Sequence, residues 1–372
     1  MLFQDIPGLE SLKQTLCQSV ADQHVAHAQL FHGGPGSGAL ALALAFATYL
    51  NCEDRTPLDA CGTCASCAKM RKLAHPDVHY IFPVASTKAI KETQSDAFLP
   101  LWRTFVAQQP YGGVPDWLEH VGAENKQGNI SAEEARNVLR KLSLKAYEGE
   151  YKIMLLWQPE WLNVYSANAL LKILEEPPEK TIFLLVCTQM DKLLPTILSR
   201  TQRVAVPAFS AEAVAGFLTQ KKGVDETRAR RLAYLADGDL HHALTLADGG
   251  ENDRHTRFAH WMRLCYRADL TQLVPLADKF DSLAKEEQKG TLEYGLSLFR
   301  DLFLWQNGGE NLVRLEGGEL TFVQNFAKAI PAERVERIVQ EFNVAYYHLE
   351  RNVRAKMVCL DLSLTLARLF KT

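Results

Sequence analysis

Residues 33–40 read Gly-Gly-Pro-Gly-Ser-Gly-Ala-Leu and lie at the junction of two apolar stretches. The preceding stretch, Gln29–His32, is typical of a short buried strand, and Ala39–Leu50 is typical of a buried helix. A glycine-rich turn from a strand into a helix can bind phosphate, because its backbone N–H groups converge on the anion and the helix adds its positive end. The stretch therefore predicts an α/β nucleotide-binding fold.

Two positions that carry the chemistry of such a loop have changed. The pattern G-x-x-x-x-G-K-[S/T] uses Lys for the phosphates and a hydroxyl for Mg²⁺, whereas Ala39 and Leu40 occupy those positions here. We expect weak or no nucleotide binding at the glycines that remain, which are Gly33, Gly36 and Gly38. The alternative is a glycine-rich turn that binds no phosphate.

A second run, Lys152–Leu156, is apolar after its lysine and predicts a buried parallel strand. In P-loop ATPases the corresponding strand ends in an Asp that helps to hold Mg²⁺, often followed by a Glu that activates water. Trp157 and Gln158 stand at these two places, and neither side chain replaces a carboxylate. The two altered sites together predict an ATPase fold without ATPase activity of its own.

Length and charge limit the function classes. A chain of 372 residues with a net charge of −3 has room for two or three domains and lacks the strong basic balance of an autonomous DNA-binding protein. The longest uncharged run, Gln23–Cys52, contains Gly, Pro, His and Gln and falls short of the ~20 consecutive apolar residues of a membrane span. The first residues show no basic leader, so we expect a cytoplasmic protein with no membrane partner.

Four cysteines follow the spacing C-x8-C-x2-C-x2-C, at Cys52, Cys61, Cys64 and Cys67. Four thiolates spaced in this way can bind one tetrahedral Zn²⁺ in a closed, structural site. A disulfide pair is the alternative, but a reducing compartment disfavours it. The other cysteines have apolar neighbours and are expected in the core; they are Cys17, Cys187, Cys265 and Cys359.

Three segments carry a family resemblance: Ser166–Pro178, Thr181–Thr188 and Leu194–Thr201. They resemble the AAA+ clamp-loader subunits of bacterial DNA polymerase III, which include the ATP-hydrolysing gamma/tau subunits and the ATPase-silent delta prime subunit. The altered phosphate loop and the Trp157-Gln158 pair resemble the delta prime branch. The resemblance implies an α/β AAA+ fold, a P-loop NTPase-like parallel sheet, with a zinc knuckle, a small helical lid and an all-α C-terminal collar.

The resemblance also implies roles for particular residues. In the family a Ser-Arg-Cys motif supplies an arginine finger to the ATP of a neighbouring subunit, and this chain has Ser199-Arg200-Thr201. Arg200, with Ser199 beside it, is therefore the candidate catalytic group in trans; the alternative is an arginine that closes a short helix. A third nucleotide-contacting segment of the family ends in Arg, where this chain has His241.

The expected organisation has three parts. Residues 1–208 form the AAA+ nucleotide-binding-like domain with the zinc module at 52–67, residues 209–248 form the lid, and residues 249–372 form a helical collar for oligomerisation. The implied partners are gamma/tau-type and delta subunits, the sliding clamp and primer-template DNA. We expect an ATPase-silent clamp-loader subunit; the alternatives are a gamma/tau-like subunit that binds ATP and a zinc-containing adaptor with no part in clamp loading.

Three local features complete the expectations. Ser131 and Glu134 have the spacing of a capping box at a helix start. The insert 88–128 is longer than the family pattern and either covers a core edge or meets a partner. Apolar residues at helical spacing predict buried faces in the C-terminal part: Val335, Ile338, Val339, Phe342, Tyr346 and Leu349, then Val353, Met357 and Leu360.

Overall fold

The computed structural model describes residues 1–124, 126–143, 146–248, 251–283, 285–309, 312–313, 315, 317–351 and 353–371. The chain divides into two compact units, Met1–Thr245 and Leu246–Thr372, and each is considered by itself. The helices of the expected lid belong to the first unit, except for the last three residues of the helix that ends at Asp248. The border between lid and collar near residue 248 stays a prediction.

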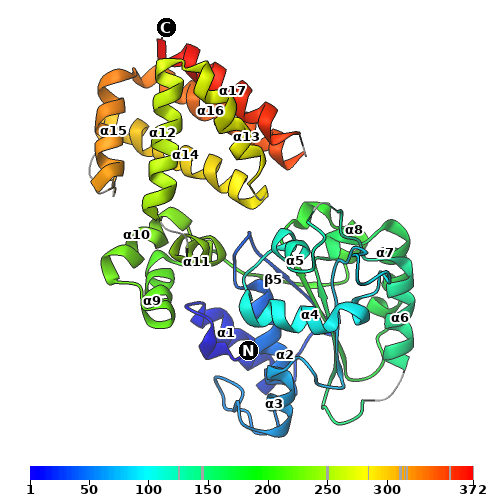
Figure 1. Ribbon diagram of the computed structural model, residues 1–372. Helices are drawn as coiled ribbons and strands as arrows, with labels where there is room; N and C mark the ends of the chain where they lie inside the picture. Colours follow the sequence, from blue (N-terminus) through cyan, green and yellow to red (C-terminus); the bar gives the residue numbers. More distant parts are fainter. Residues whose placement is uncertain are drawn as a thin grey trace. The chain divides into compact units, whose positions relative to one another are not determined.

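A parallel sheet forms the centre of the first unit (Figure 1). In the described residues its strand order is β2-β3-β4-β1-β5. The strands are β1 (Ala28–His32), β2 (Val78–Ile81), β3 (Lys152–Trp157), β4 (Thr181–Cys187) and β5 (Gln202–Ala205). The predicted strand before the glycine loop and the predicted parallel strand at Lys152 are both confirmed, and all neighbouring strands pair in parallel.

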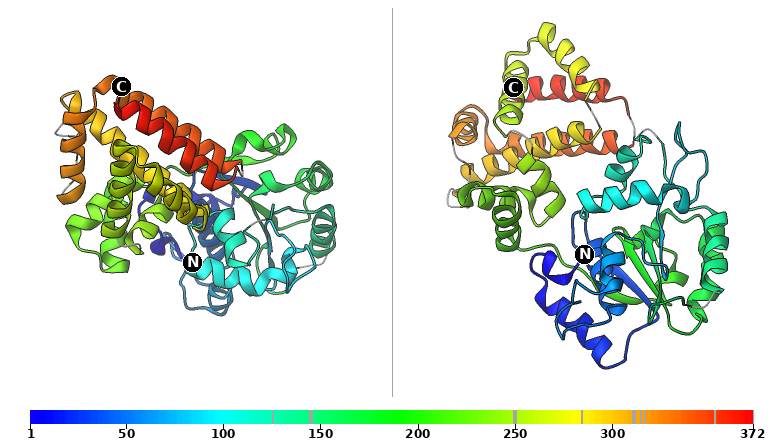
Figure 2. Two further views of the ribbon diagram at one scale, coloured as in Figure 1. Left: turned by 45° about the horizontal axis from the view of Figure 1, so that its top comes forward. Right: turned by 60° about the horizontal axis from the view of Figure 1, so that its bottom comes forward.

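Helices cover both faces of this sheet, as the two views of Figure 2 show. The α-helices of the unit are α1 (Glu10–Ala21), α2 (Ala39–Leu50), α3 (Ala65–Arg71), α4 (Ser95–Gln108), α5 (Val114–His120), α6 (Ala132–Ser143), α7 (Val164–Glu175), α8 (Pro195–Leu198), α9 (Ala211–Lys222), α10 (Glu226–Ala236) and α11 (Leu240–Asp248). Short 3-10 helices are η1 (Phe3–Asp5), η2 (Pro159–Trp161) and η3 (Met190–Lys192).

The strand period of two assigns alternate residues to opposite faces. Leu30 of β1 packs in one core cluster with Leu170 and Leu174 of α7, whereas the ring of Phe31 lies 6.2 Å from that of Phe46 on α2. Every residue of α2 is buried, which explains why its sequence is apolar on all sides. The predicted α/β AAA+ architecture of this unit is confirmed.

The insert 88–128 packs over an edge of the core, which is one of the two roles that the sequence left open. Its helices α4 and α5 contribute Trp102 and Trp117, both fully buried. The ring of Trp102 lies 5.0 Å from that of Trp157 at the end of β3, and the indole N–H of Trp117 donates to the carbonyl of Pro83 at 2.7 Å. The aromatic residue in place of the catalytic Asp is therefore a packing residue for the insert.

The predicted capping box at α6 is only half formed. Ser131 Oγ accepts the backbone N–H of Glu134 at 3.3 Å. The Glu134 carboxylate does not return to Ser131; it is buried and accepts the N–H of Ser95, at the start of α4, at 2.7 Å. The prediction that Glu134 bonds back to Ser131 is therefore wrong, because the carboxylate instead bonds to Ser95, which is distant in the sequence.

The second unit is helical in its described residues, drawn from yellow-green to red in Figure 2. Its helices are α12 (Glu251–Arg267), α13 (Leu270–Asp281), α14 (Lys285–Gln306), α15 (Gly317–Ala329), α16 (Ala332–Glu350) and α17 (Ala355–Lys371). Val335, Ile338 and Phe342 are buried as predicted. Val353 and Met357 are 43% and 65% exposed, contrary to prediction, because α16 ends at Glu350 and a new helix with a different buried face begins.

Among the helices of the described residues, none is both long and apolar enough to span a bilayer. The four cysteines expected in the core are buried, and no disulfide bond joins any of the cysteines, all of which lie in the described residues.

Asp301 is a buried charge in the second unit. It is 2% exposed, and its Oδ2 has no hydrogen-bond partner. Burial raises the pKa of this carboxyl to about 6. The positive charge of Arg300 acts to lower this pKa, and the negative charge of Glu319 acts to raise it further. Because the folded-state pKa lies above the ordinary value of 3.8, the folded unit holds a proton that the unfolded chain releases between about pH 4 and 6. Its stability therefore falls as the pH rises through that window and stays lower above it.

We expect Asp301→Asn to raise the Tm of the second unit by about 5 °C at pH 8 and to lose this advantage near pH 4. Calorimetry of the full chain at pH 4, 6 and 8 measures the effect. Asp361→Asn, at an exposed aspartate of α17, is the control. A change in Tm that is the same at every pH would contradict the assignment.

Candidate functional site

The phosphate loop between β1 and α2 is crowded by the chain itself. A Cβ on Gly33 would lie 2.5 Å from Ser37 Oγ and 2.6 Å from the carbonyl oxygen of Val206. A Cβ on Gly38 would lie 3.0 Å from the ring of Phe209. Close packing of neighbouring segments thus favours glycine at positions 33 and 38 whether or not a phosphate is bound, whereas Gly34 has open space around it.

The two substituted positions are part of the core. Ala39 and Leu40 are each 4% exposed, at the first turn of α2. Ile6 and Leu9 lie within van der Waals reach of a Cβ on Gly38, so apolar groups line the helix end that a nucleotide would approach. Neither substituted side chain can contact a phosphate or a metal ion.

Asp239 is a site residue that the sequence analysis missed. Its carboxylate lies directly against Gly36, where a Cβ would be 1.7 Å from Oδ1, and Gly36 has a φ of +63°. The same oxygen accepts the N–H of His242 at 2.8 Å, so Asp239 caps the start of α11. The cap could have been found from an Asp just before an apolar helical segment, but its contact with the phosphate loop has no local signal.

The second altered site, Trp157 and Gln158 at the end of β3, is also occupied by buried side chains. Gln158 is 3% exposed, and its Oε1 accepts the hydroxyl of Thr188 at 3.1 Å. Glu160 is the nearest carboxylate along the chain after this strand; its Oε1 accepts the N–H groups of Thr188 and Gln189 at 2.9 and 3.1 Å. Burial raises the pKa of Glu160, although these backbone N–H groups act to lower it. Glu160 holds the loop after β4.

His241 contacts the insert. Its Nε2 lies 3.0 Å from Asp116 Oδ1 of α5. Burial acts to raise the pKa of Asp116, but the hydrogen bond and charge of His241 together with backbone hydrogen bonds, among them that from Gly113, hold that pKa below its usual range. The residue predicted at the third nucleotide-contacting position is therefore bound to a carboxylate of its own chain.

Arg200 lies just after α8 with 31% of its side chain exposed. Its Nε donates to Glu175 Oε1 at 2.5 Å, and Nη1 donates to the carbonyl of Thr196 at 2.9 Å and to Ser199 Oγ at 3.2 Å. The bond to the Thr196 carbonyl is expected if Arg200 closes the short helix α8. The partial exposure of the Arg200 side chain is expected if it contacts the ATP of a neighbouring subunit. Both interpretations remain compatible with the geometry, and Ser199 helps to orient the guanidinium in either case.

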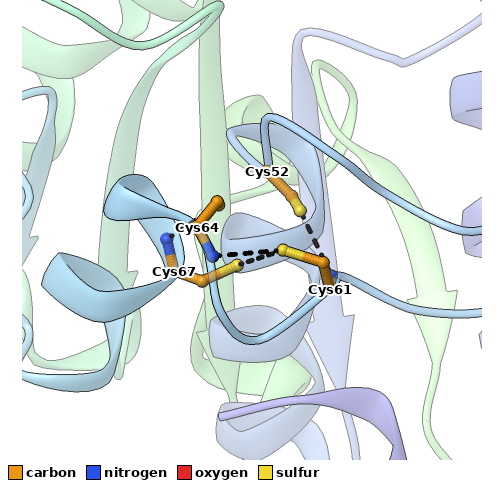
Figure 3. A group of neighbouring side chains, drawn as sticks. All are labelled: Cys52, Cys61, Cys64 and Cys67. Atoms are coloured by element: carbon orange, nitrogen blue, oxygen red, sulfur yellow. Dashed lines mark hydrogen bonds between the residues drawn. The ribbon is translucent and has the colours of Figure 1, made fainter.

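The four predicted metal ligands come together (Figure 3). The sulfur atoms of Cys52, Cys61, Cys64 and Cys67 all lie within 4.8 Å of one another, and those of Cys61 and Cys67 are 4.0 Å apart. A tetrahedral Zn²⁺ with Zn–S bonds of about 2.3 Å needs sulfur atoms about 3.8 Å apart. The cluster therefore has the size of a structural metal site and can hold a metal ion.

Backbone N–H groups point at these sulfur atoms. Thr63 and Cys64 donate to Cys61 Sγ at 3.4 and 3.3 Å, and these hydrogen bonds lower the pKa of Cys61 to about 6. Burial raises the pKa of Cys52 and of Cys67. Four thiolates gathered without a cation would repel one another, and a metal ion removes that repulsion.

The basic residues near the knuckle and on α6 are partly paired. Lys69 contacts Glu148 at 2.5 Å and Lys141 contacts Asp96 at 2.6 Å, whereas Arg136 is exposed. Lys145, which continues the basic cluster in the sequence, lies outside the described residues.

The strand order, the glycine loop after β1 and the lid helices beside that loop define an AAA+ protein of the P-loop class whose own nucleotide site has lost its reactive groups. The family described as "DNA polymerase III, delta subunit" matches residues 8–210. The chain belongs to this DNA polymerase III clamp-loader family.

The sequences of several DNA polymerase III subunits are similar to this chain, in agreement with the family assignment. The chain is 29% identical to DNA polymerase III subunit delta' of Yersinia pestis, over 81% of this chain and 76% of that protein. It is 25% identical to subunit tau of Bacillus subtilis over 94% of this chain, and 30% identical to subunit tau/gamma of Haemophilus influenzae over 66%. The chain spans 58% of the length of the former and 30% of the latter.

Proposed function

We propose that the chain is a delta prime-type subunit of a DNA polymerase III clamp loader. It hydrolyses no ATP itself, offers Arg200 and the adjoining Ser199 to the ATP of a neighbouring gamma/tau-type subunit, and helps to load the sliding clamp on primed DNA. Its other partner is a delta-type subunit, residues 249–372 serve as its oligomerisation collar, and its cysteine cluster holds a structural Zn²⁺.

One observation carries the ATPase-silent assignment: at both altered sites, the phosphate loop and the end of β3, buried side chains without suitable chemistry occupy the reactive positions. Ala39 and Leu40 pack in the core where a Lys and a hydroxyl are needed, and Trp157 packs against the insert where an Asp is needed. Restoring only one of the Lys, the hydroxyl or the Asp would leave the other two missing. The site therefore supports a structural role for the fold in place of ATP hydrolysis.

Electrostatics support the same conclusion. The carboxylate of Asp239 stands beside Gly36, at the loop that would cradle the phosphates. Two like unit charges about 4 Å apart near a protein surface repel by about 4 kcal/mol. In place of the lost lysine cation, a nucleotide would thus meet a fixed negative charge.

We expect the isolated chain to show no Mg²⁺-dependent ATP binding at micromolar concentrations. Loss of charged hydrogen bonds to phosphate costs about 1.5–3 kcal/mol each, and the Mg²⁺ ligands are missing as well. Equilibrium binding of a fluorescent ATP analogue measures this, with a gamma/tau-type subunit as the positive control. Mg²⁺-dependent micromolar binding would contradict the proposal and favour the gamma/tau-like alternative.

Assembly separates the proposal from the adaptor alternative. Mixed with gamma/tau-type and delta-type subunits, the chain should elute in one complex, and that complex should hydrolyse ATP faster when clamp and primed DNA are added. A chain that joins no such complex is the result expected of the adaptor.

A further inference from the structure

We propose that the insert 88–128 and the start of lid helix α11 form a latch that keeps the lid closed on the phosphate loop without any nucleotide. The latch residues are Gly36, Tyr111, Asp116, Asp239 and His241. The proposal concerns the isolated chain and holds whether or not the chain joins a clamp loader.

The lid contacts the phosphate loop directly. The backbone N–H of Leu240 donates to the carbonyl of Gly36 at 3.2 Å, and the Asp239 carboxylate occupies the space that a Cβ on Gly36 would need. Gly238, with a φ of +84°, brings the chain into this position; a Cβ there would lie 2.8 Å from the carbonyl oxygen of Phe209. The backbone is thus shaped for contact between lid and loop.

The lid also touches the insert through a charged pair. The two carboxylate oxygens of Asp116 have different partners. Oδ2 accepts the N–H of Gly113 at 2.7 Å and caps α5, while Oδ1 lies within hydrogen-bond distance of His241 Nε2 of α11. The two side chains are 19% and 27% exposed. A partly buried pair with this geometry is worth more than a pair on an open surface.

An aromatic contact adds to the charged one. Tyr111 of the insert is 5% exposed and meets the rings of Phe209 and Phe217 edge-on, at 5.9 and 6.0 Å. Edge-to-face pairs at such separations are favourable beyond the apolar area they bury. Since the insert is itself anchored on Trp157, the lid is tied to the end of the central sheet.

These contacts replace what a nucleotide would otherwise do. A lid that is held through a bound nucleotide can open when the nucleotide leaves, because that contact contributes only to the closed state. Here each contact comes from the chain, so the closed lid needs no ligand.

Hydrogen exchange of the full chain, followed by mass spectrometry, tests the latch. The variants are His241→Ala, Asp116→Asn and the double mutant, with and without Mg²⁺-ATP. The control is Glu226→Gln, which breaks the exposed Glu226–Arg230 pair within the same lid. Peptides from β1, β3 and β4 report whether each variant remains folded.

We expect wild-type exchange in residues 205–248 to be slow and unchanged by Mg²⁺-ATP. Each single variant should speed exchange there about tenfold while the strands and the control stay unchanged. The double mutant should be no faster than the faster single variant, because both remove one interaction. Lid exchange that slows on adding Mg²⁺-ATP, or that neither single variant alters, would overturn the proposal.

Discussion

Replacing Arg200 by alanine is expected to lower the clamp- and DNA-stimulated hydrolysis of ATP at the neighbouring subunit's site by about 10³-fold. The estimate is the lower end of the 10³–10⁵-fold effect of arginine fingers in GTPases. A guanidinium suits this role because it stays charged and presents a planar fork to phosphate oxygens. The total rate of a ring with several ATP sites should fall at least by the share of that one site.

The surroundings of Arg200 leave it able to act in trans. Glu175 and the Thr196 carbonyl hold the guanidinium from one side, while 31% of the side chain stays exposed. A solvent-exposed ion pair of this kind is worth about 0–1 kcal/mol. The internal contacts can therefore orient Arg200 without competing seriously with the γ-phosphate of a neighbour.

Two further variants make this result specific. Arg203→Ala removes an exposed arginine of β5 three residues away and should leave the rate unchanged. Arg200→Lys keeps the charge but loses the fork, and it should recover only a small part of the activity. The measurement is single-turnover hydrolysis in a complex whose assembly has been verified by gel filtration. An unaltered rate with Arg200→Ala would leave Arg200 as a residue that closes α8.

Much of the first unit could be predicted because its signals are local. The strand before residue 33, the buried strand at Lys152 and the apolar α2 each follow from a short pattern. The cysteine spacing likewise brings its four sulfur atoms into one cluster. Patterns of this kind depend on neighbours along the chain, which the sequence displays directly.

The parts that escaped prediction depend on contacts between distant segments. Asp239 meets Gly36 and Asp116 meets His241 across separations of more than a hundred residues. Glu134 likewise bonds to Ser95 instead of completing its local box. Nothing in the adjoining residues signals such partners, and only the folded chain selects them.

Removing one cysteine ligand should abolish the binding of one Zn²⁺ per chain. We expect Cys61→Ser to lose the metal and to lower the Tm of the first unit by about 10 °C, because structural zinc contributes folding free energy directly. Metal analysis, calorimetry and limited proteolysis of residues 52–67 measure the three consequences. Cys265→Ala, in the second unit, should keep its zinc.

The effect should extend beyond the knuckle. Cys52 follows α2 and Cys64 caps α3, so the metal would tie these two helix ends together. Asp59 within the module accepts the N–H groups of Phe3 and Gln4 at 3.0 and 2.9 Å. Loss of the metal should therefore also expose the first residues of the chain to protease.

A thiol count distinguishes the metal from a disulfide. A chain with Zn²⁺ should show all 8 cysteines as free thiols after denaturation with a chelator, whereas a disulfide pair would remove two. Full thiol content with no bound zinc, in protein prepared under reducing conditions with zinc supplied, would contradict the site. The four sulfur atoms belong to a short module within a much larger folded unit. We therefore expect zinc to contribute only part of the folding free energy that it contributes in zinc-finger peptides, which have little other core.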